Sequence, residues 1–334
     1  MNSPKNKRIP WIDALKGWGI LFMMYGHIEF APRFLKQYTS PVMLVVFFVA
    51  AGYTFRSEQD FKPFLIKKIR TLLWPWFLFA SLNILLTQIL TFSEQEPLAD
   101  QFIDLFIQVR GKTDGLWFFP CMFMSIILYY WLDRIIKSKP LFYAINFLLL
   151  CGSLAFIRLT GIALPWHIQI WGAACFYMAI GAAYKEHEST LKPIFTRKIF
   201  LTAMFIGFTA SWWLSRSIYP DTQYNFYHCE DSILFYILSM VFGIAGMLSF
   251  VQVLPSLWIT EYAGRNSLMY FAFHGKPKRL FTVLLQKYAL VGVGNETYDL
   301  LWALSDTALL AVILIIPCEI VIKWLPWMLG KGKK

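Results

Sequence analysis

The sequence predicts an all-α polytopic membrane protein, and three observations support this. Of the 334 residues, 57% are hydrophobic and 18% are aromatic. Only 15% are charged, whereas soluble domains carry about 25%. The hydrophobic residues also gather in long blocks, and only helices or closed barrels span hydrocarbon without leaving backbone groups unpaired. A bundle of transmembrane helices is therefore the expected fold class.

Ten apolar blocks are candidate membrane spans, each near the ~20 residues that a helix needs to cross about 30 Å of hydrocarbon. They cover residues 12–29, 40–55, 71–92, 115–132, 141–158, 167–184, 199–216, 231–250, 265–285 and 301–324. The first block has no small-residue cleavage site, so we expect an uncleaved span rather than a signal peptide. We expect a single transmembrane domain over residues 1–334, with a core from about 8 to 325.

The distribution of Lys and Arg predicts the orientation. With the N-terminus inside, roughly three cations lie on the inner side for each one outside, which predicts that both termini are cytoplasmic in a cell (inner or plasma) membrane. The net charge of +11 then reflects inner loops that face anionic headgroups of the lipid bilayer. No Lys/Arg-rich arm with interleaved aromatic residues is present, which argues against nucleic-acid binding.

Two features on the predicted outer side have both a structural and a functional interpretation. Trp117 lies near the outer end of a span, where we expect a residue of the interfacial aromatic belt rather than a platform for a sugar. His228 lies in a loop rich in Tyr, Asp and Asn, a composition that suits a carbohydrate surface. Ordinary loop residues are an equal alternative there.

The first candidate span carries a stripe of ionisable side chains, Asp13, Lys16 and His27. Lys16 and His27 are close to three helical turns apart, so both point the same way, about 16 Å apart along the axis. An ionisable residue inside a span is a functional candidate because its burial in lipid is costly, and histidine exchanges protons near neutral pH. A structural histidine bonded to a neighbouring helix is the alternative, and Lys16 on the same face favours function.

Three cations, Lys67, Lys68 and Arg70, cluster where the chain is expected to re-enter the membrane after the second span. Lys67 and Arg70 are three residues apart and share a helix face. Cations at a membrane surface commonly set topology and contact lipid headgroups. They also clamp the phosphates of anionic substrates, and the cluster alone does not decide between these roles.

Five segments together resemble membrane acyltransferase family 3, and within it the fucose 4-O-acetylase-like branch of O-acetyltransferases. They are PWIDALKGWGILFMMYGH, VFFVAAGYTFR, KKIRTLLWPW, LWFFPCMF and YAGRNSLMYFAFHG, in the order and at the spacing usual in that family. The resemblance implies an acyltransferase-3-like bundle of about ten helices. It also implies an enzyme that moves an acyl group, usually acetyl from acetyl-CoA, onto glycans of the cell envelope.

The resemblance assigns roles to several positions. Lys16 and His27 match the family's Arg-x10-His, with Lys in place of Arg, so a bidentate guanidinium is lost while the charge is kept. Lys67 and Arg70 match the family's RxxR, again with Lys in the first position. The resemblance therefore implies that Lys16, Lys67, Lys68 and Arg70 contact the substrate or CoA.

Further matches imply supporting roles. Gly52 matches a small residue near the end of the second helix, and His274 matches a histidine that often follows the late Asn-Ser pair. We expect Asn266 and Ser267 of that pair to cap a helix rather than to contact substrate. For His274, acceptor positioning or proton transfer and a structural contact at a helix break are equal alternatives.

These roles predict O-acetylation of a carbohydrate hydroxyl, with His27 as the general base. An acetyl-enzyme formed on His27 is the alternative chemistry. The expected partners are an acyl-CoA donor and a carbohydrate acceptor, with acetyl-CoA as co-substrate, no tightly bound cofactor and no metal. The competing function is a secondary transporter or glycan exporter, which ten spans and an intramembrane histidine also allow. A non-catalytic membrane partner is a third possibility.

Overall fold

The computed structural model describes residues 8–56, 60–90, 96–109, 116–219, 233–288, 290–291 and 295–331. Within these ranges the chain forms helices and no strand, which confirms the predicted all-α fold class. The α-helices in chain order are α1 (Pro10–Gly26), α2 (Arg33–Met43), α3 (Val45–Tyr53), α4 (Phe61–Lys68), α5 (Trp74–Leu90), α6 (Leu98–Ile107), α7 (Phe118–Ile135), α8 (Lys139–Thr160), α9 (Ile168–Glu186), α10 (Glu188–Phe195), α11 (Lys198–Ile218), α12 (Ile233–Val253), α13 (Trp258–Arg265), α14 (Ser267–Phe273), α15 (Gly275–Lys287), α16 (Glu296–Ile313) and α17 (Ile315–Trp324). Short helical turns of other types are η1 (Ile69–Leu73, a π-helix), η2 (Pro165–His167) and η3 (Pro326–Leu329).

Several of these helices are long and apolar enough to cross a membrane. Among the described residues there are six such stretches, or seven if the pair α10 and α11, bent by 80°, forms one span. The six are Arg33–Tyr53, Phe61–Ile89, Phe118–Ile135, Lys139–Thr160, Ile233–Val253 and Glu296–Trp324. The predicted number of ten is therefore not confirmed. One reason is that α1 has only 17 residues, and another is that the predicted span 265–285 is broken at His274.

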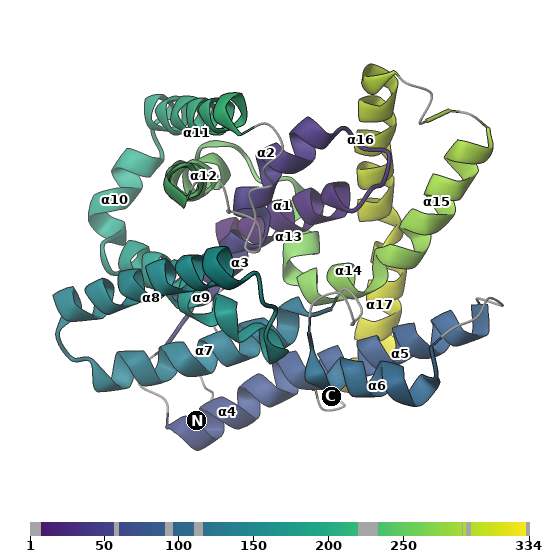
Figure 1. Cartoon of the computed structure of the whole chain (residues 1–334), viewed down its shortest axis with the longest axis horizontal. Coiled ribbons are helices and arrows are strands. Elements are labelled where there is room, and N and C mark those ends of the chain that lie inside the picture. The colour runs from purple at the N-terminus through teal and green to yellow at the C-terminus, as the bar shows by residue number, and fades with distance from the viewer. Residues whose placement is uncertain are drawn as a thin grey trace.

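Helix α1 lies near the middle of the bundle, beside α13 from the far end of the sequence (Figure 1). Glycines allow the two backbones to touch. A Cβ atom on Gly17 would lie 1.9 Å from the carbonyl oxygen of Thr260, and one on Gly264 would lie 1.7 Å from that of Asp13. Small residues are the usual means of close helix packing in membranes, so this pair of glycines fixes α1 against α13.

A second glycine contact joins α3 to α9, which also lie side by side in Figure 1. A Cβ atom on Gly52 would lie 1.9 Å from the carbonyl oxygen of Met178, and one on Gly181 would lie 1.9 Å from that of Val49. The structure thus gives Gly52 a packing contact between helices. The side chains above and below this contact, including Phe48 and Tyr177, are fully buried.

Helices α4 and α5 form one continuous rod, joined by the π-helical turn η1 along the lower edge of Figure 1. Lys67, Lys68 and Arg70 therefore lie within a helix rather than at the start of one, which corrects the predicted start of the third span at residue 71. A π-helical turn inserts an extra residue and rotates the helix beyond it. It therefore changes which side chains of this cluster share a face.

Candidate functional site

The three ionisable residues of the predicted stripe lie on α1 and at its C-terminal end. Helix α1 is unbroken from Pro10 to Gly26, and His27 follows directly as its C-terminal cap residue. The ammonium of Lys16 lies 2.9 Å from Asp13 Oδ1, and their side chains are 25% and 13% exposed. This ion pair holds the Lys16 ammonium at the N-terminal end of the stripe.

A cavity of about 510 Å³ opens at this end of α1. Five cations and two carboxylates line it, together with Ile9, Ile12, Tyr53 and Thr54. The cations are Arg8, Lys16, Arg56, Lys185 and Arg265, and the carboxylates are Asp13 and Glu188. Both carboxylates have partners, because Glu188 accepts a 2.6 Å hydrogen bond from the Tyr53 hydroxyl and Asp13 pairs with Lys16. The cavity therefore presents a surplus of positive charge, as an anion-binding site requires.

A second cavity of about 270 Å³ shares Ile12, Lys16 and Thr54 with the first. It extends along α1 as far as Ile20 and is bounded by residues from α3, α4, η1, α7 and α14. Its walls are mainly apolar, and its polar side chains are Lys16, Thr54, Lys68, Thr71 and Ser267. The two cavities together form a route that begins at the cations and continues between the helices.

The basic cluster divides between this route and the outer surface. Lys68 and Thr71 line the second cavity. Lys67 and Arg70 are both exposed, and neither lines either cavity. The structure thus brings Lys16 and Lys68 together and leaves the Lys67-x-x-Arg70 pair outside the route.

His27 and His274 meet at the opposite end of α1. His274 lies at the break between α14 and α15, and its ring centroid is 5.2 Å from that of His27. The ring of Phe271, which lines the second cavity, lies 6.1 Å from His274. His27 is exposed, although its neighbours Tyr25 and Ile28 are buried. The two histidines therefore lie just beyond the far wall of the route.

Hydrogen bonds fix the proton positions on both rings. His27 Nδ1 lies 2.7 Å from the Met23 carbonyl oxygen, and His274 Nδ1 lies 2.9 Å from that of Phe271. A carbonyl only accepts, so Nδ1 must carry the proton in each bond. In the neutral ring Nε2 then has a lone pair. Each histidine is thus held in the tautomer that accepts a proton at Nε2.

A further set of charged groups surrounds His27. Lys278 on α15 donates a 2.9 Å hydrogen bond to the His27 carbonyl oxygen, and its ammonium is 3.8 Å from Glu29 Oε1. Asp306 on α16 is only 4% exposed, and neither carboxylate oxygen has a hydrogen-bond partner in the described part of the chain. Lys278 is the cation whose charge acts on Asp306. Burial of a carboxylate without a hydrogen bond lowers the stability of the fold. The hydrogen-bonding groups near this end of α1 are therefore incompletely paired in the described chain.

Two supporting residues occupy positions that differ from the expectation. Asn266 lies between α13 and α14 but makes no side-chain cap to α14. Instead its amide donates to the Tyr262 carbonyl oxygen at 3.1 Å and satisfies the end of α13. Asn266 therefore caps the C-terminal end of α13 rather than the start of α14, and Ser267 lines the second cavity.

Trp117 immediately precedes α7 and packs within the protein. Its ring centroid is 4.7 Å from that of His167, and it contacts the main hydrophobic core. His167 is fully buried and has a positive φ of 56°. His228 and most of its outer loop lie outside the described residues.

The sequence singles out Lys16 but neither the other four cations of the first cavity nor Asp306. Arg8, Arg56, Lys185 and Arg265 enter the interpretation of the sequence only as inner charges that set topology. Asp306 lies in a predicted span, so the rule that identifies His27 applies to it as well. No group of three or more His, Cys, Asp or Glu residues could hold a metal ion within the ranges that the structure describes.

Comparison with known proteins identifies the family. No curated protein and no solved structure matches the chain. A family model described as "Acyltransferase domain" matches residues 9–324, nearly the whole chain. That range includes both histidines and, with one exception, the residues that line the two cavities. The exception is Arg8, one of the five cations of the first cavity. The chain therefore belongs to the acyltransferase-3 family of membrane acyltransferases.

Proposed function

We propose that the protein transfers an acetyl group from cytoplasmic acetyl-CoA to a hydroxyl of a carbohydrate, with His27 as the general base. One observation supports this most strongly. The two adjoining cavities begin at five cations and extend along α1 toward a pair of histidines whose Nδ1 atoms donate to backbone carbonyl oxygens. A long, thin thioester with a phosphorylated end fits such a route.

The donor binds with its charged end at the mouth. CoA carries phosphates, and the surplus cations there, Arg265 and Lys185 among them, make charge-assisted hydrogen bonds to phosphate oxygens. Lys16 and Lys68 continue the positive charge into the second cavity. The thin pantetheine arm lies along the mainly apolar walls beyond them. The mouth is on the cytoplasmic side in the predicted orientation, where the donor is made.

The transfer occurs at the histidine end. The acceptor hydroxyl attacks the thioester carbonyl carbon while His27 Nε2 takes up the hydroxyl proton. A carbon–oxygen bond forms, the carbon–sulfur bond breaks, and the proton passes from His27 to the departing CoA thiolate. Lys278 places a positive charge at this end of α1, where it opposes the negative charge that develops on the carbonyl oxygen. His274, 5.2 Å away from His27 between ring centroids, orients the acceptor.

The test uses purified protein in lipid nanodiscs with acetyl-CoA, together with mass analysis of surface glycans from cells. We expect His27→Ala to lower transfer by about 10²–10⁴-fold, the usual contribution of a general base, while acetyl-CoA binding is retained. Arg265→Ala is expected to weaken acetyl-CoA binding and to leave the turnover of saturated protein near normal. A wild-type protein that neither binds acetyl-CoA nor acetylates glycans would refute the proposal.

The same samples separate the alternatives. An acetyl group on His27 detected by intact-mass analysis after incubation with acetyl-CoA alone would indicate the covalent route. Glycan transport into vesicles without acetylation would favour the transporter. The family match favours acyl transfer over transport.

A further inference from the structure

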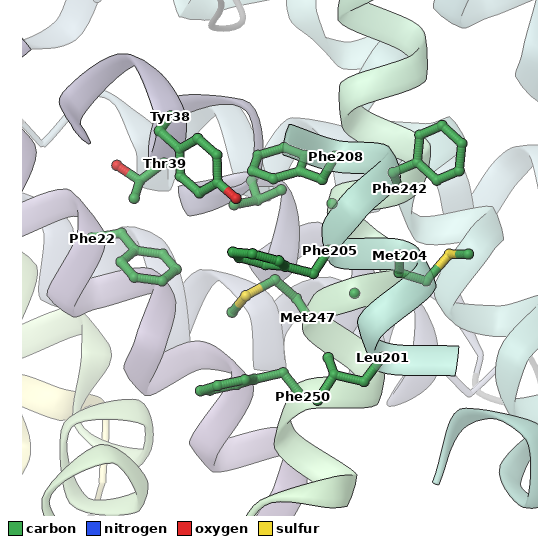
Figure 2. A pocket seen from close by; sticks show the side chains of 13 residues that line it. Phe22, Tyr38, Thr39, Leu201, Met204, Phe205, Phe208, Phe242, Met247 and Phe250 are labelled. Atoms are coloured by element: carbon green, nitrogen blue, oxygen red, sulfur yellow. The ribbon is translucent and has the colours of Figure 1, made fainter. Parts of the chain in front are cut away.

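An apolar pocket of about 160 Å³ lies away from the histidines, between α1, α2, α11 and α12. Figure 2 shows side chains of α1 and α2 facing those of α11 and α12 across it. The lining includes Phe22, Tyr38, Phe205, Phe208, Met247 and Phe250. An apolar cavity of about 150 Å³ in another protein stays dry and binds small hydrocarbons. A pocket of this size therefore suits a short length of one hydrocarbon chain.

The few polar groups in the pocket wall are already satisfied. The Tyr38 hydroxyl is 2.8 Å from Thr209 Oγ1, and the Thr39 hydroxyl donates to the Leu35 carbonyl oxygen at 3.0 Å. Water gains little in such a site because it needs two or more polar partners. The pocket is therefore a site for hydrocarbon rather than for the sugar or the donor.

The pocket is accessible from the hydrocarbon core of the membrane. Phe205 on its wall is 59% exposed, and α12 is one of the helices able to span the bilayer. On α12, Gly243 and Gly246 line the pocket. A Cβ atom on Gly246 would meet only the Met204 Cβ, at an ordinary 3.6 Å. A side chain at position 246 would therefore fit without a clash at its Cβ atom and would occupy part of the pocket.

Arg216 lies on α11, closer to its C-terminal end than the residues that line the pocket. The ring of Trp212 lies 5.4 Å from that of Tyr38 and 5.7 Å from the Arg216 guanidinium. Arg216 Nη1 is buried and has no hydrogen-bond partner within the described ranges. By helix geometry Arg216 is about 16 Å along α11 from Phe205. A guanidinium suits phosphate oxygens, so apolar pocket and cation together match a molecule with one chain and a phosphate.

Along α1, the pocket is about one and a half helical turns before His27. Phe22 on α1 precedes His27 by about 7.5 Å of helix rise. Lys36, one turn before the pocket residue Thr39 on α2, donates to the Glu29 carbonyl oxygen at 3.2 Å. Phe22 and the Lys36–Glu29 hydrogen bond thus link the walls of the pocket to the segment around His27.

We propose that this pocket and Arg216 bind a single-chain polyprenyl-type lipid phosphate that carries the acceptor saccharide. The chain occupies the apolar pocket, Arg216 binds the phosphate, and the saccharide extends to His27. This inference rests on the proposed acetyl transfer and names the class of its acceptor, a membrane-anchored glycan precursor.

Native mass spectrometry of the purified protein tests the binding. The probes are a polyprenyl phosphate, the matching polyprenol without phosphate, and phosphatidylglycerol as a two-chain anionic lipid, with inorganic phosphate as a competitor. We expect the polyprenyl phosphate to bind at least tenfold more tightly than the other two lipids, and millimolar phosphate not to displace it. Equal binding of polyprenyl phosphate and phosphatidylglycerol would overturn the proposal, because it would identify an ordinary lipid contact.

Two pairs of variants locate the site. Gly246→Leu fills the pocket and is expected to reduce polyprenyl phosphate binding at least tenfold, whereas Gly246→Ala, the matched control, changes it by less than about threefold. Arg216→Gln is expected to reduce binding of the phosphate about tenfold and binding of the polyprenol hardly at all. Thermal unfolding verifies that each variant is folded, and unchanged binding in folded Gly246→Leu protein would refute the assignment.

A separate measurement distinguishes this inference from the proposed function. Acetyl-CoA consumption by wild-type protein and by His27→Ala reports on the acetyl transfer itself. Consumption that depends on His27, without selective polyprenyl phosphate binding, would refute only the acceptor class. Selective lipid binding without any acetyl-CoA binding would refute the proposed function, and with it the role of the lipid as an acetyl acceptor.

Discussion

The two ends of α1 differ in how well their groups are satisfied. At the N-terminal end, Gly17 and Gly264 bring the α1 and α13 backbones into contact, and Lys16 pairs with Asp13. At the other end, His27 is exposed, and Tyr25 and Asp306 have buried oxygens without hydrogen-bond partners in the described chain. Proteins commonly tolerate unfavourable groups at functional sites when the rest of the structure compensates for them. The difference indicates that α1 is anchored at one end, whereas the other end, where we propose that transfer occurs, has polar groups without hydrogen-bond partners in the described chain.

The largest expected effect comes from breaking the anchored end. Gly264→Ala places a methyl group 1.7 Å from the Asp13 carbonyl oxygen, where backbone must move. We expect a loss of about 3 kcal/mol or more, at the upper end of what overpacking costs, seen as a lower unfolding temperature in detergent. Gly152→Ala is the control, because a Cβ atom there meets nothing within 4 Å. Its expected effect is a gain of about 0.5–1 kcal/mol from helix propensity, and equal destabilisation of both variants would contradict the contact.

The next prediction is a gain in stability, at the end of α1 that carries His27. Asp306→Asn removes a buried charge that lacks a hydrogen-bond partner in the described chain, so we expect the protein to gain about 1–2 kcal/mol. Acetyl transfer should fall at the same time, because the charges around His27 change. Thermal unfolding and transfer assays on one preparation measure both. A destabilisation of about 3–5 kcal/mol would show instead that Asp306 and Lys278 form a buried ion pair.

The smallest expected effects concern acetyl-CoA binding. They test whether Lys68, which lines the second cavity, contributes more than Lys67, which does not. Lys68→Ala removes a cation from the second cavity and is expected to weaken acetyl-CoA binding about tenfold, as the loss of a charge-assisted hydrogen bond does. Lys67→Ala is the matched control, since Lys67 lines neither cavity. Its expected effect is less than about twofold. Titration with acetyl-CoA measures both, and a larger effect of Lys67→Ala would reverse the assignment.

The sequence predicted what depends on one helix at a time. The all-α class follows from composition, and the shared face of Lys16 and His27 follows from helix periodicity. The family match then confirmed the resemblance to acyltransferase family 3, whereas the fucose 4-O-acetylase-like branch stays a prediction. The roles of the individual site residues also stay predictions.

What the sequence could not predict depends on how distant segments meet. Nothing in the pattern around Gly264 shows that Asp13 will touch it, since helices separated by much of the chain must first dock. The contact between His27 and His274 has the same origin. The second cavity is lined by Lys68 and Thr71 rather than by Lys67 and Arg70, on a rod that contains the π-helical turn η1. A local change of helix register of this kind leaves little trace in hydrophobic periodicity.

The last turn of the described chain bears on how the protein is handled in the laboratory. Trp74 donates from Nε1 to the Trp327 carbonyl oxygen at 3.0 Å. Gly330, with a φ of 66°, lies against the Arg70 carbonyl oxygen, where a Cβ atom would be only 1.9 Å away. The C-terminal segment thus packs against the η1 turn, next to Lys68. An affinity tag fused directly after Gly330 is therefore expected to disturb the packing beside the second cavity, and a fluorophore on this segment is expected to respond to a ligand that binds there.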